Sequence, residues 1–291
     1  MRQSLQELFE KRLEQFVSNK RISNSTYPKA EKKIASLAKR SAEIVKVNAS
    51  GNIIQTIDDG DIKTVTYQVH YKYLINQKGN LYQEEEVEVR AGIFNQDILI
   101  IDEEMNPYES GVSHPPFPLE ESEDEEIRIS YKYNRLKAVQ YAERWWNTYN
   151  PAYHKFENDC TNFISQCLDA GGAPMRGHPN RGSGWWYRNK NWSYSWAVAH
   201  ALRLHLGHSK SGLRTRQVSS PDQLLLGDVI CYDFEGDGRF NHNTIVTGKD
   251  AFGMPLVNAH TYNSRQRYWA YEDSSAYTPN MKYKFFTIVD G

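Results

Sequence analysis

A proline- and acid-rich segment limits how this chain can fold. Residues 105–127 contain four prolines, followed by six acidic residues within seven positions. Such a composition is unsuited to a buried core and typical of a linker. The 291 residues are enough for two domains, each with its own core. We therefore expect one domain at 1–104, a linker at 105–127 and a second domain at 128–291.

The first domain has the pattern of two helices followed by a curved antiparallel sheet. Residues 3–20 and 27–40 have helical periodicity. Strand-like runs follow near 43–48, 52–57, 62–74, 80–91 and 97–102. The alternation of apolar and polar residues from Val65 to Tyr73 predicts a strand with one solvated face, and Gly79 suits the following turn. We predict an α+β accessory domain with a cone-like fold, without a catalytic role and with an unknown partner.

Residues 158–172 predict a helix that carries a cysteine in its first turn. Asp159 is a suitable N-cap, and Gly171 and Gly172 end the pattern. One apolar stripe is formed by Cys160, Phe163, Ile164, Cys167 and Leu168. A thiol at the N-terminus of a helix is favoured as the thiolate, which is the nucleophilic form. Cys160 is therefore the candidate nucleophile, whereas Cys167 is predicted to be a core residue.

Three short predicted strands near the C-terminus carry two histidines that are candidates for the catalytic base and its orienting group. The predicted strands lie near 227–232, 240–248 and 255–261; His242 opens the second and His260 ends the third. A meander of this kind could hold His242 against the cysteine helix as a base, with His260 beside it as the orienting group. That is the arrangement expected of a thiol hydrolase.

These motifs resemble the papain-like cell-wall peptidases of bacteria, and more closely the bacterial putative amidase domain. The resemblance covers roughly residues 130–290 and is carried by several separated motifs in order. They are Tyr133-Asn134-Arg135, Trp145-Trp146-Asn147, the 158–172 block, Gly184-Trp185-Trp186, Ser195-Trp196, Gly227-Asp228-Val229-Ile230 and Asn241-His242-Asn243-Thr244-Ile245-Val246. The resemblance implies an α+β, papain-like cysteine hydrolase domain in which the cysteine helix packs on an antiparallel sheet.

The resemblance also implies a cysteine amidohydrolase with Cys160 as nucleophile, His242 as base and His260 as the third, polar member. Its substrate would be a peptide or a peptidoglycan fragment, and it would need no cofactor or metal. The backbone N–H of Cys160 would contribute to an oxyanion site, supported by Asp159 and Asn158. The predicted substrate cleft comprises Trp185, Trp186, Trp196 and Asn241, with the loop 176–191 as its wall.

Two alternatives to hydrolysis stay open at the sequence level. The same thiol could transfer its acyl group to an amine instead of to water. A second alternative is a non-catalytic module that binds a peptide or a glycan in the aromatic cleft. An unreactive Cys160 with an ordinary thiol pKa would favour this second alternative.

Two sets of residues imitate metal sites. The acidic turn at 233–238 resembles the start of a calcium loop, but Thr244 stands where the bidentate glutamate is required. His200, His205 and His208 have no carboxylate or cysteine at ligand spacing, and cationic histidines at a helix end explain them more simply.

Net charge, cysteine count and the distribution of apolar residues argue against several classes of protein. A formal charge of −1 and the lack of a basic block argue against a nucleic-acid partner. Three cysteines are an odd number and do not indicate a disulfide framework. We see no signal-peptide h-region and no run of membrane-span length, so the chain as given reads as cytoplasmic. A peptidoglycan enzyme would then need another route of export or a leader removed from this sequence.

Overall fold

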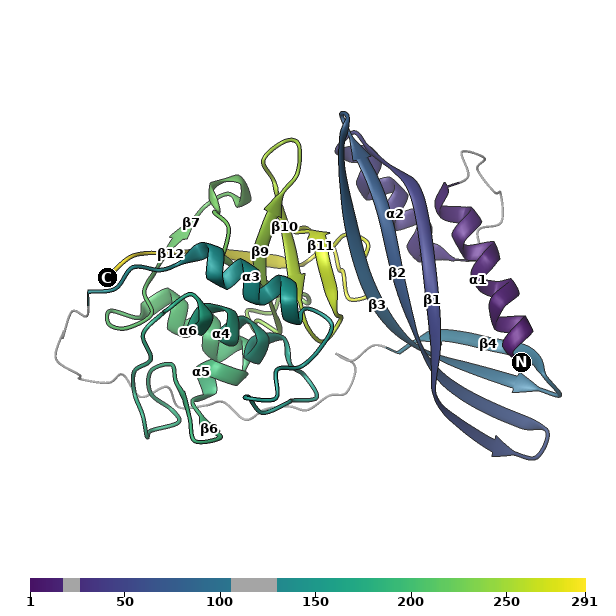
Figure 1. The fold of residues 1–291 in the computed structure, drawn as a ribbon, viewed down its shortest axis with the longest axis horizontal. Coiled ribbons are helices and arrows are strands. Elements are labelled where there is room, and N and C mark those ends of the chain that lie inside the picture. The colour runs from purple at the N-terminus through teal and green to yellow at the C-terminus, as the bar shows by residue number, and fades with distance from the viewer. Residues whose placement is uncertain (18–26, 106–129) are drawn as a thin grey trace. The chain divides into compact units, whose positions relative to one another are not determined.

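The chain divides into two compact units (Figure 1). The computed structural model describes residues 1–17, 27–105 and 130–291, so the predicted linker lies almost wholly outside the described residues. Unit 1 comprises Met1–Glu109 with Ala270–Tyr277, and unit 2 comprises Ser110–Trp269 with Thr278–Gly291. The predicted α+β class is confirmed. No local sequence pattern indicated that the segment 270–277 belongs to the first unit.

Unit 1 consists of two helices and a four-stranded antiparallel sheet. Its elements are α1 (Arg2–Val17), α2 (Pro28–Lys39), β1 (Ala42–Asp59), β2 (Ile62–Gln77), β3 (Asn80–Asn95) and β4 (Ile98–Glu104). The strands lie in the order β1-β2-β3, and β4 pairs with β3. The runs predicted separately at 43–48 and 52–57 form the single strand β1, because the residues between them continue to pair with β2.

One face of β2 forms the core of unit 1, as the alternation predicted. Val65, Tyr67, Val69, Tyr71 and Tyr73 are all at most 1% exposed, whereas the intervening residues are partly or fully accessible. The helices cover this face. The turn after β2 contains Gly79 at a φ of 86°, a left-handed conformation that glycine adopts without steric cost.

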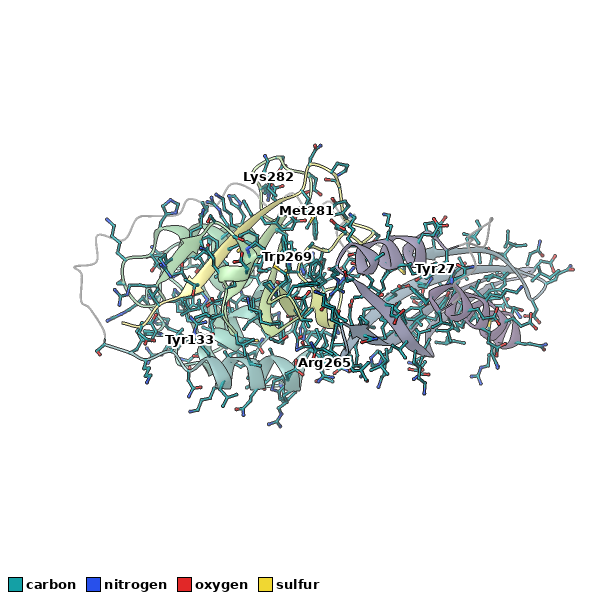
Figure 2. All side chains as sticks on the ribbon, turned by 90° about the horizontal axis from the view of Figure 1, so that it is seen from above. Tyr27, Tyr133, Arg265, Trp269, Met281 and Lys282 are labelled. Carbon is teal, nitrogen blue, oxygen red and sulfur yellow. The ribbon has the colours of Figure 1, made fainter. Side chains whose placement is uncertain are left out.

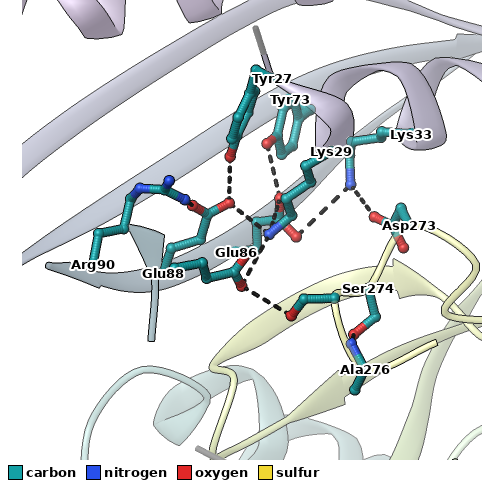
Figure 3. Close-up of polar contacts among 12 residues, drawn as sticks. Tyr27, Lys29, Lys33, Tyr73, Glu86, Glu88, Arg90, Asp273, Ser274 and Ala276 are labelled. Carbon is teal, nitrogen blue, oxygen red and sulfur yellow. Dashed lines mark hydrogen bonds and ion pairs between the residues drawn. The ribbon is translucent and has the colours of Figure 1, made fainter. Parts of the chain in front are cut away.

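A buried ionic layer lies between α2 and β3 (Figure 3). The Lys33 ammonium donates to Glu84 at 2.6 Å and to Asp273 at 2.9 Å, and Lys29 donates to Glu88 at 2.6 Å. All of these carboxylates are less than 10% exposed. Since Asp273 lies on the segment 270–277, this layer attaches that segment to unit 1.

Unit 2 has helices and loops packed against a six-stranded antiparallel sheet of order β11-β10-β9-β8-β12-β7. Its helices are α3 (Arg135–Trp145), α4 (Cys160–Ala170), α5 (Tyr194–Ala197) and α6 (Ala199–His208), with a 3-10 turn η1 (Pro221–Gln223). The sheet strands are β7 (Thr215–Val218), β8 (Val229–Asp233), β9 (His242–Lys249), β10 (Pro255–Ala259), β11 (Ser264–Tyr268) and β12 (Lys282–Ile288), and β5 (Tyr187–Arg188) pairs with β6 (Asn191–Trp192). The predicted cysteine helix and the three-strand meander are confirmed.

Helix α4 is the central helix of unit 2. Every residue from Cys160 to Leu168 is buried. Gly171, at the end of the helix, packs against the ring of Tyr133, so closely that a Cβ atom at position 171 would lie only 2.2 Å from it. Tyr133 is labelled in Figure 2. The Tyr133 hydroxyl donates to the carbonyl of Gly227 at 2.9 Å, which ties this end of α4 to the start of β8.

Candidate active site

The first turn of α4 is capped by a side chain from a different part of the chain. The Thr261 hydroxyl oxygen accepts hydrogen bonds from the backbone N–H groups of Asp159 and Cys160, both at 3.1 Å. Asp159 occupies the N-cap position, but its carboxylate caps no backbone group of the helix. The predicted N-cap position of Asp159 is confirmed, but the capping hydrogen bonds are made by Thr261, just beyond β10.

The buried Asp159 carboxylate instead organises the residues around the helix start. One oxygen accepts from the backbone N–H of Phe156 at 3.0 Å and from the Asn162 side chain at 2.9 Å. The other pairs with His260 Nδ1 at 2.8 Å. Asp159 thus connects the loop before the helix to the histidine at the end of β10.

His260 is held on all sides. Its Nε2 atom lies 2.7 Å from the carbonyl oxygen of Trp145, its ring stacks on Phe163 at 4.0 Å, and Tyr149 meets it edge-on at 5.2 Å. The Asp159 carboxylate and the Trp145 carbonyl oxygen thus lie within hydrogen-bond distance of the two ring nitrogens. The result is a buried histidine–carboxylate pair one residue from Cys160.

His242 has different surroundings. The next residue, Asn243, donates to Thr161 on α4 at 3.0 Å, so Asn243 faces the helix. Since side chains alternate along a strand, His242 faces the other side of the sheet. There its ring neighbours are Tyr232 and Phe234, at 5.6 and 5.9 Å between centroids. Burial lowers the pKa of His242 to about 3, so its ring is neutral at pH 7.

The structure therefore brings Cys160, Asp159 and His260 together at the N-terminus of α4 and directs His242 away from it. In the sequence, both histidines begin or end short apolar strands, and nothing local indicates which face each one occupies. A shift of one residue in strand register exchanges the two faces.

The electrostatic environment of the thiol differs from the expectation. Burial raises the pKa of Cys160 above its ordinary value, and the negative charge of Asp159 acts in the same direction. Hydrogen bonds from the Thr161 hydroxyl and the Asn243 backbone N–H offset this only in part. The predicted preference for thiolate is thus wrong for this conformation, because removal from water outweighs the position at the helix terminus. Cys167 is fully buried, as predicted for a core residue.

The three tryptophans predicted to line a cleft are core residues. Trp185, Trp186 and Trp196 are 1%, 1% and 0% exposed. Their indole N–H groups also have internal acceptors: Trp185 donates to Ser165 at 2.9 Å and Trp196 to Asn162 at 2.8 Å. The cleft prediction is corrected accordingly, because all three rings are buried and those of Trp185 and Trp196 are bonded to residues of α4.

The other predicted support and cleft residues lie at the surface. Asn158 is exposed beside Asp159. Asn241 is half-buried, accepts from the Phe234 backbone N–H at 3.3 Å and donates to Glu235. Asn241 therefore holds the acidic turn in shape.

An aromatic surface next to the helix start was missed by the sequence reasoning. His154 stacks on Trp192 at 4.9 Å, and Phe156 meets the same indole edge-on at 4.9 Å. The loop that carries His154 and Phe156 is anchored to Asn162 and Asp159. The high aromatic content of residues 149–156 was the signal that could have indicated it.

The acidic turn forms a closed hairpin. The two Asp233 oxygens accept from the backbone N–H groups of Gly236 and Gly238 at 2.7 and 2.8 Å. Among the described residues, the one group spaced like metal ligands is Glu84, Glu86 and Asp273, and Lys33 already bonds two of its members. The prediction of cationic histidines on α6 is wrong for His205, because burial lowers its pKa to about 4.

Across residues 1–17, 27–105 and 130–291, we find no helix with the length and apolar character that a membrane span requires.

Comparison with known proteins places the chain in a family. The sequence is 53% identical to "Uncharacterized protein YhbB" of Bacillus subtilis (strain 168) over 267 residues, which cover 89% of this chain and 86% of that protein. It is 29% identical to "Uncharacterized protein YjcM" of the same organism over 140 residues, 45% of this chain and 31% of that protein. No solved structure matches. Residues 132–286, more than half of the chain, match the family described as "Putative amidase domain", and the chain belongs to that family.

Proposed function

We propose that this protein is a thiol amidase in which Cys160 is the nucleophile and His260, oriented by Asp159, transfers the proton. The observation that carries the proposal is the 2.8 Å pair between Asp159 and His260 directly beside the cysteine at the start of α4. A nucleophile, a histidine and an acidic orienting group are the parts of a cysteine hydrolase site. The membership in a family described as an amidase domain supports the same reaction class.

The reaction would proceed in two steps. The Cys160 sulfur bonds to the amide carbonyl carbon, the C–N bond breaks, and the thiol proton passes through His260 to the departing amine. Water then attacks the thioester, releases the carboxylic acid and restores the thiol. The His260 nitrogens are bonded to Asp159 and to the Trp145 carbonyl, so the proposal requires the ring to exchange Trp145 for the sulfur when substrate enters.

The substrate class proposed is a peptide amide, with peptidoglycan stem peptides as the first group to test. Support for this class comes from the resemblance of the 158–172 and 241–246 motifs to bacterial cell-wall peptidases. The aromatic surface formed by exposed His154 and partly buried Phe156 and Trp192 lies next to the helix start and offers apolar contact area to such a substrate.

The test combines thiol reactivity with turnover. We would measure iodoacetamide labelling of each cysteine across pH, and release of amines from purified peptidoglycan fragments, for wild type, Cys160→Ala, His260→Ala and His242→Ala. Cys160→Ala and His260→Ala should abolish turnover, and Cys167→Ala serves as the matched cysteine control. Because His242 faces away from α4, His242→Ala should retain turnover if it folds. The opposite result would contradict the proposal. If folded His242→Ala lost turnover while His260→Ala kept it, His242 would be the base.

Reaction with added hydroxylamine would separate acyl transfer from hydrolysis.

A second candidate function is a non-catalytic binding module. The raised pKa of Cys160 and its 4% exposure favour this reading, because an inaccessible thiol is a poor nucleophile. Under this reading Cys160 labels only as fast as Cys167 at every pH, and peptidoglycan fragments bind without release of amine.

A further inference from the structure

The outer edge of the sheet in unit 1 is suited to accept another strand. β1 is the terminal strand of the order β1-β2-β3, and no other described strand pairs with its second edge. From Val47 to Ile57 it contains neither a charged residue nor a proline. Charges and prolines are the usual means of protecting an edge strand from pairing. Here the edge is irregular only at the register shifts near Val45 and Ile54.

A groove follows this edge. A cavity of about 640 Å³ lies between α1 and the middle of β1, within unit 1. Its apolar lining includes Phe9 and Leu13 of α1, Ile53 of β1 and Tyr67 of β2. The Phe9 and Tyr67 rings meet edge-on at 5.7 Å between centroids. Gly51 allows the Phe9 ring to approach β1 closely at one side of the groove, because a Cβ atom there would lie 3.2 Å from that ring. Figure 1 shows α1 running alongside β1.

Two exposed charges of opposite sign line the helical wall of the groove. Arg2 and Glu10 are both exposed, and both belong to the lining. They are eight positions apart in the helix, about 12 Å along its axis. In a strand this distance corresponds to about four residues. Residues i, i+2 and i+4 of a strand point to the same side, so one such set spans the groove.

We propose that this groove binds an extended peptide that adds as a strand to β1. The peptide presents, on one face, an acidic side chain toward Arg2, an apolar side chain between Phe9 and Ile53, and a basic side chain toward Glu10. Backbone hydrogen bonds to the β1 edge provide affinity, and the three side chains provide selectivity. The ligand is thus recognised by an acid-x-apolar-x-base pattern, read in one strand direction.

Charge and geometry favour a peptide over the other occupants. A fatty acid would satisfy Arg2 but would place its tail beside Glu10, and it could not use the backbone groups of β1. A second copy of this chain would bring its own α1 to the same edge, where the two helices would compete for one space.

The test is a specificity reversal. We would measure fluorescence polarisation of the full chain with two labelled peptides, Ser-Glu-Thr-Ile-Thr-Lys-Ser and its charge-exchanged form Ser-Lys-Thr-Ile-Thr-Glu-Ser. Wild type should prefer one of them by about fivefold, as expected for two exposed ion pairs. The double variant Arg2→Glu/Glu10→Lys should prefer the other by a similar factor. The matched control Glu7→Lys/Lys11→Glu exchanges exposed charges of α1 outside the groove and should keep the wild-type preference.

Two results would overturn the proposal. In the first, both peptides bind equally, or neither binds, or the preference survives the charge exchange at Arg2 and Glu10. In the second, a peptide N-methylated at its isoleucine and at the threonine that follows binds as tightly as its parent, which excludes pairing with the β1 edge. None of these measurements depends on amidase activity, so they stand whether or not Cys160 is a nucleophile.

Discussion

Helix α2 of unit 1 and helix α4 of unit 2 are both fixed to a sheet by buried polar groups, but the groups differ in charge. Beneath α2, the ammonium groups of Lys29 and Lys33 meet carboxylates of β3 and Asp273. Beneath α4, most contacts are between neutral groups, such as those of Thr261 and Asn243, and the buried Asp159 carboxylate pairs with His260.

This difference indicates which substitutions should destabilise each unit most. A buried ion pair gives little net stability when intact, yet removal of one partner leaves an uncompensated charge that is costly. A neutral hydrogen bond is cheaper to lose. Unit 1 should therefore depend most on individual charges, and unit 2 on its packing and on the Asp159–His260 pair.

The two units can be followed separately during unfolding. All seven tryptophans lie between Trp145 and Trp269, in unit 2. Tryptophan fluorescence therefore reports on unit 2 alone, whereas far-UV circular dichroism reports on both units.

The largest effect is expected for Lys33→Met. The substitution keeps much of the side-chain volume but leaves Glu84 and Asp273 without the shared ammonium that lies 2.6 and 2.9 Å from them. We expect unit 1 to lose about 3–5 kcal/mol of unfolding free energy. The measurement is urea unfolding by circular dichroism, which should shift far more than the fluorescence transition.

The control for that experiment is Lys39→Met on the same helix. Lys39 also pairs with a carboxylate, Glu272 at 2.8 Å, but its side chain is 67% exposed. Its removal should leave the urea midpoint unchanged within error, since solvent already screens this pair. Equal shifts for the two lysine variants would remove burial as the cause.

In unit 2 the matching substitution is Asp159→Asn. It preserves size but removes the charge that faces His260, and an amide N–H would point at a ring nitrogen that already carries a hydrogen. We expect about 1.5–3 kcal/mol of lost stability, seen in the fluorescence transition. If the transition did not move, the Asp159–His260 pair would not be a support of unit 2.

A smaller effect is expected for Thr261→Val. The hydroxyl that accepts two backbone hydrogen bonds at the start of α4 disappears, while the shape is retained. The loss of a cap of this kind costs about 1–2 kcal/mol. Thr261→Ser keeps the hydroxyl and is the control; it should unfold at nearly the wild-type urea concentration in the fluorescence assay.

Helices and strands were predicted from the sequence better than the faces, burial and long-range contacts of individual side chains. Helix α4 and strand β2 were predictable because their apolar residues repeat with the helical or the strand period. The face occupied by His242 was not, because it depends on the register of β9 beneath α4. The burial of Trp185 and Trp196 was also missed, since a loop rich in glycine and arginine gives no local sign that α4 will cover its rings. Similarly, Asp273 joins unit 1 through contacts with a lysine 240 positions away in the chain.

The smallest effect, and the one that tests the ionic layer without removing a lysine, is the pH dependence of Glu84→Gln. Burial raises the pKa of Glu84 above its ordinary value, the Lys33 ammonium opposes this, and Asp273 and Glu86 reinforce it. Between the ordinary and the raised pKa, native Glu84 holds a proton that the unfolded chain has released. Unit 1 should therefore gain stability as the pH falls from neutral toward the ordinary carboxyl range, and gain no more from this group below it.

Glu84→Gln should reduce that gain, because the amide does not titrate and can still accept from Lys33. It should not abolish the gain, since burial also raises the pKa of Glu104. The measurement is the circular-dichroism urea midpoint at pH 7, 6 and 5, with fluorescence as the unit 2 reference. If the variant followed the wild-type profile at all three values, Glu84 would titrate as an ordinary carboxylate. The contrast between a charged layer under α2 and a mostly neutral one under α4 would then rest on Lys33 alone.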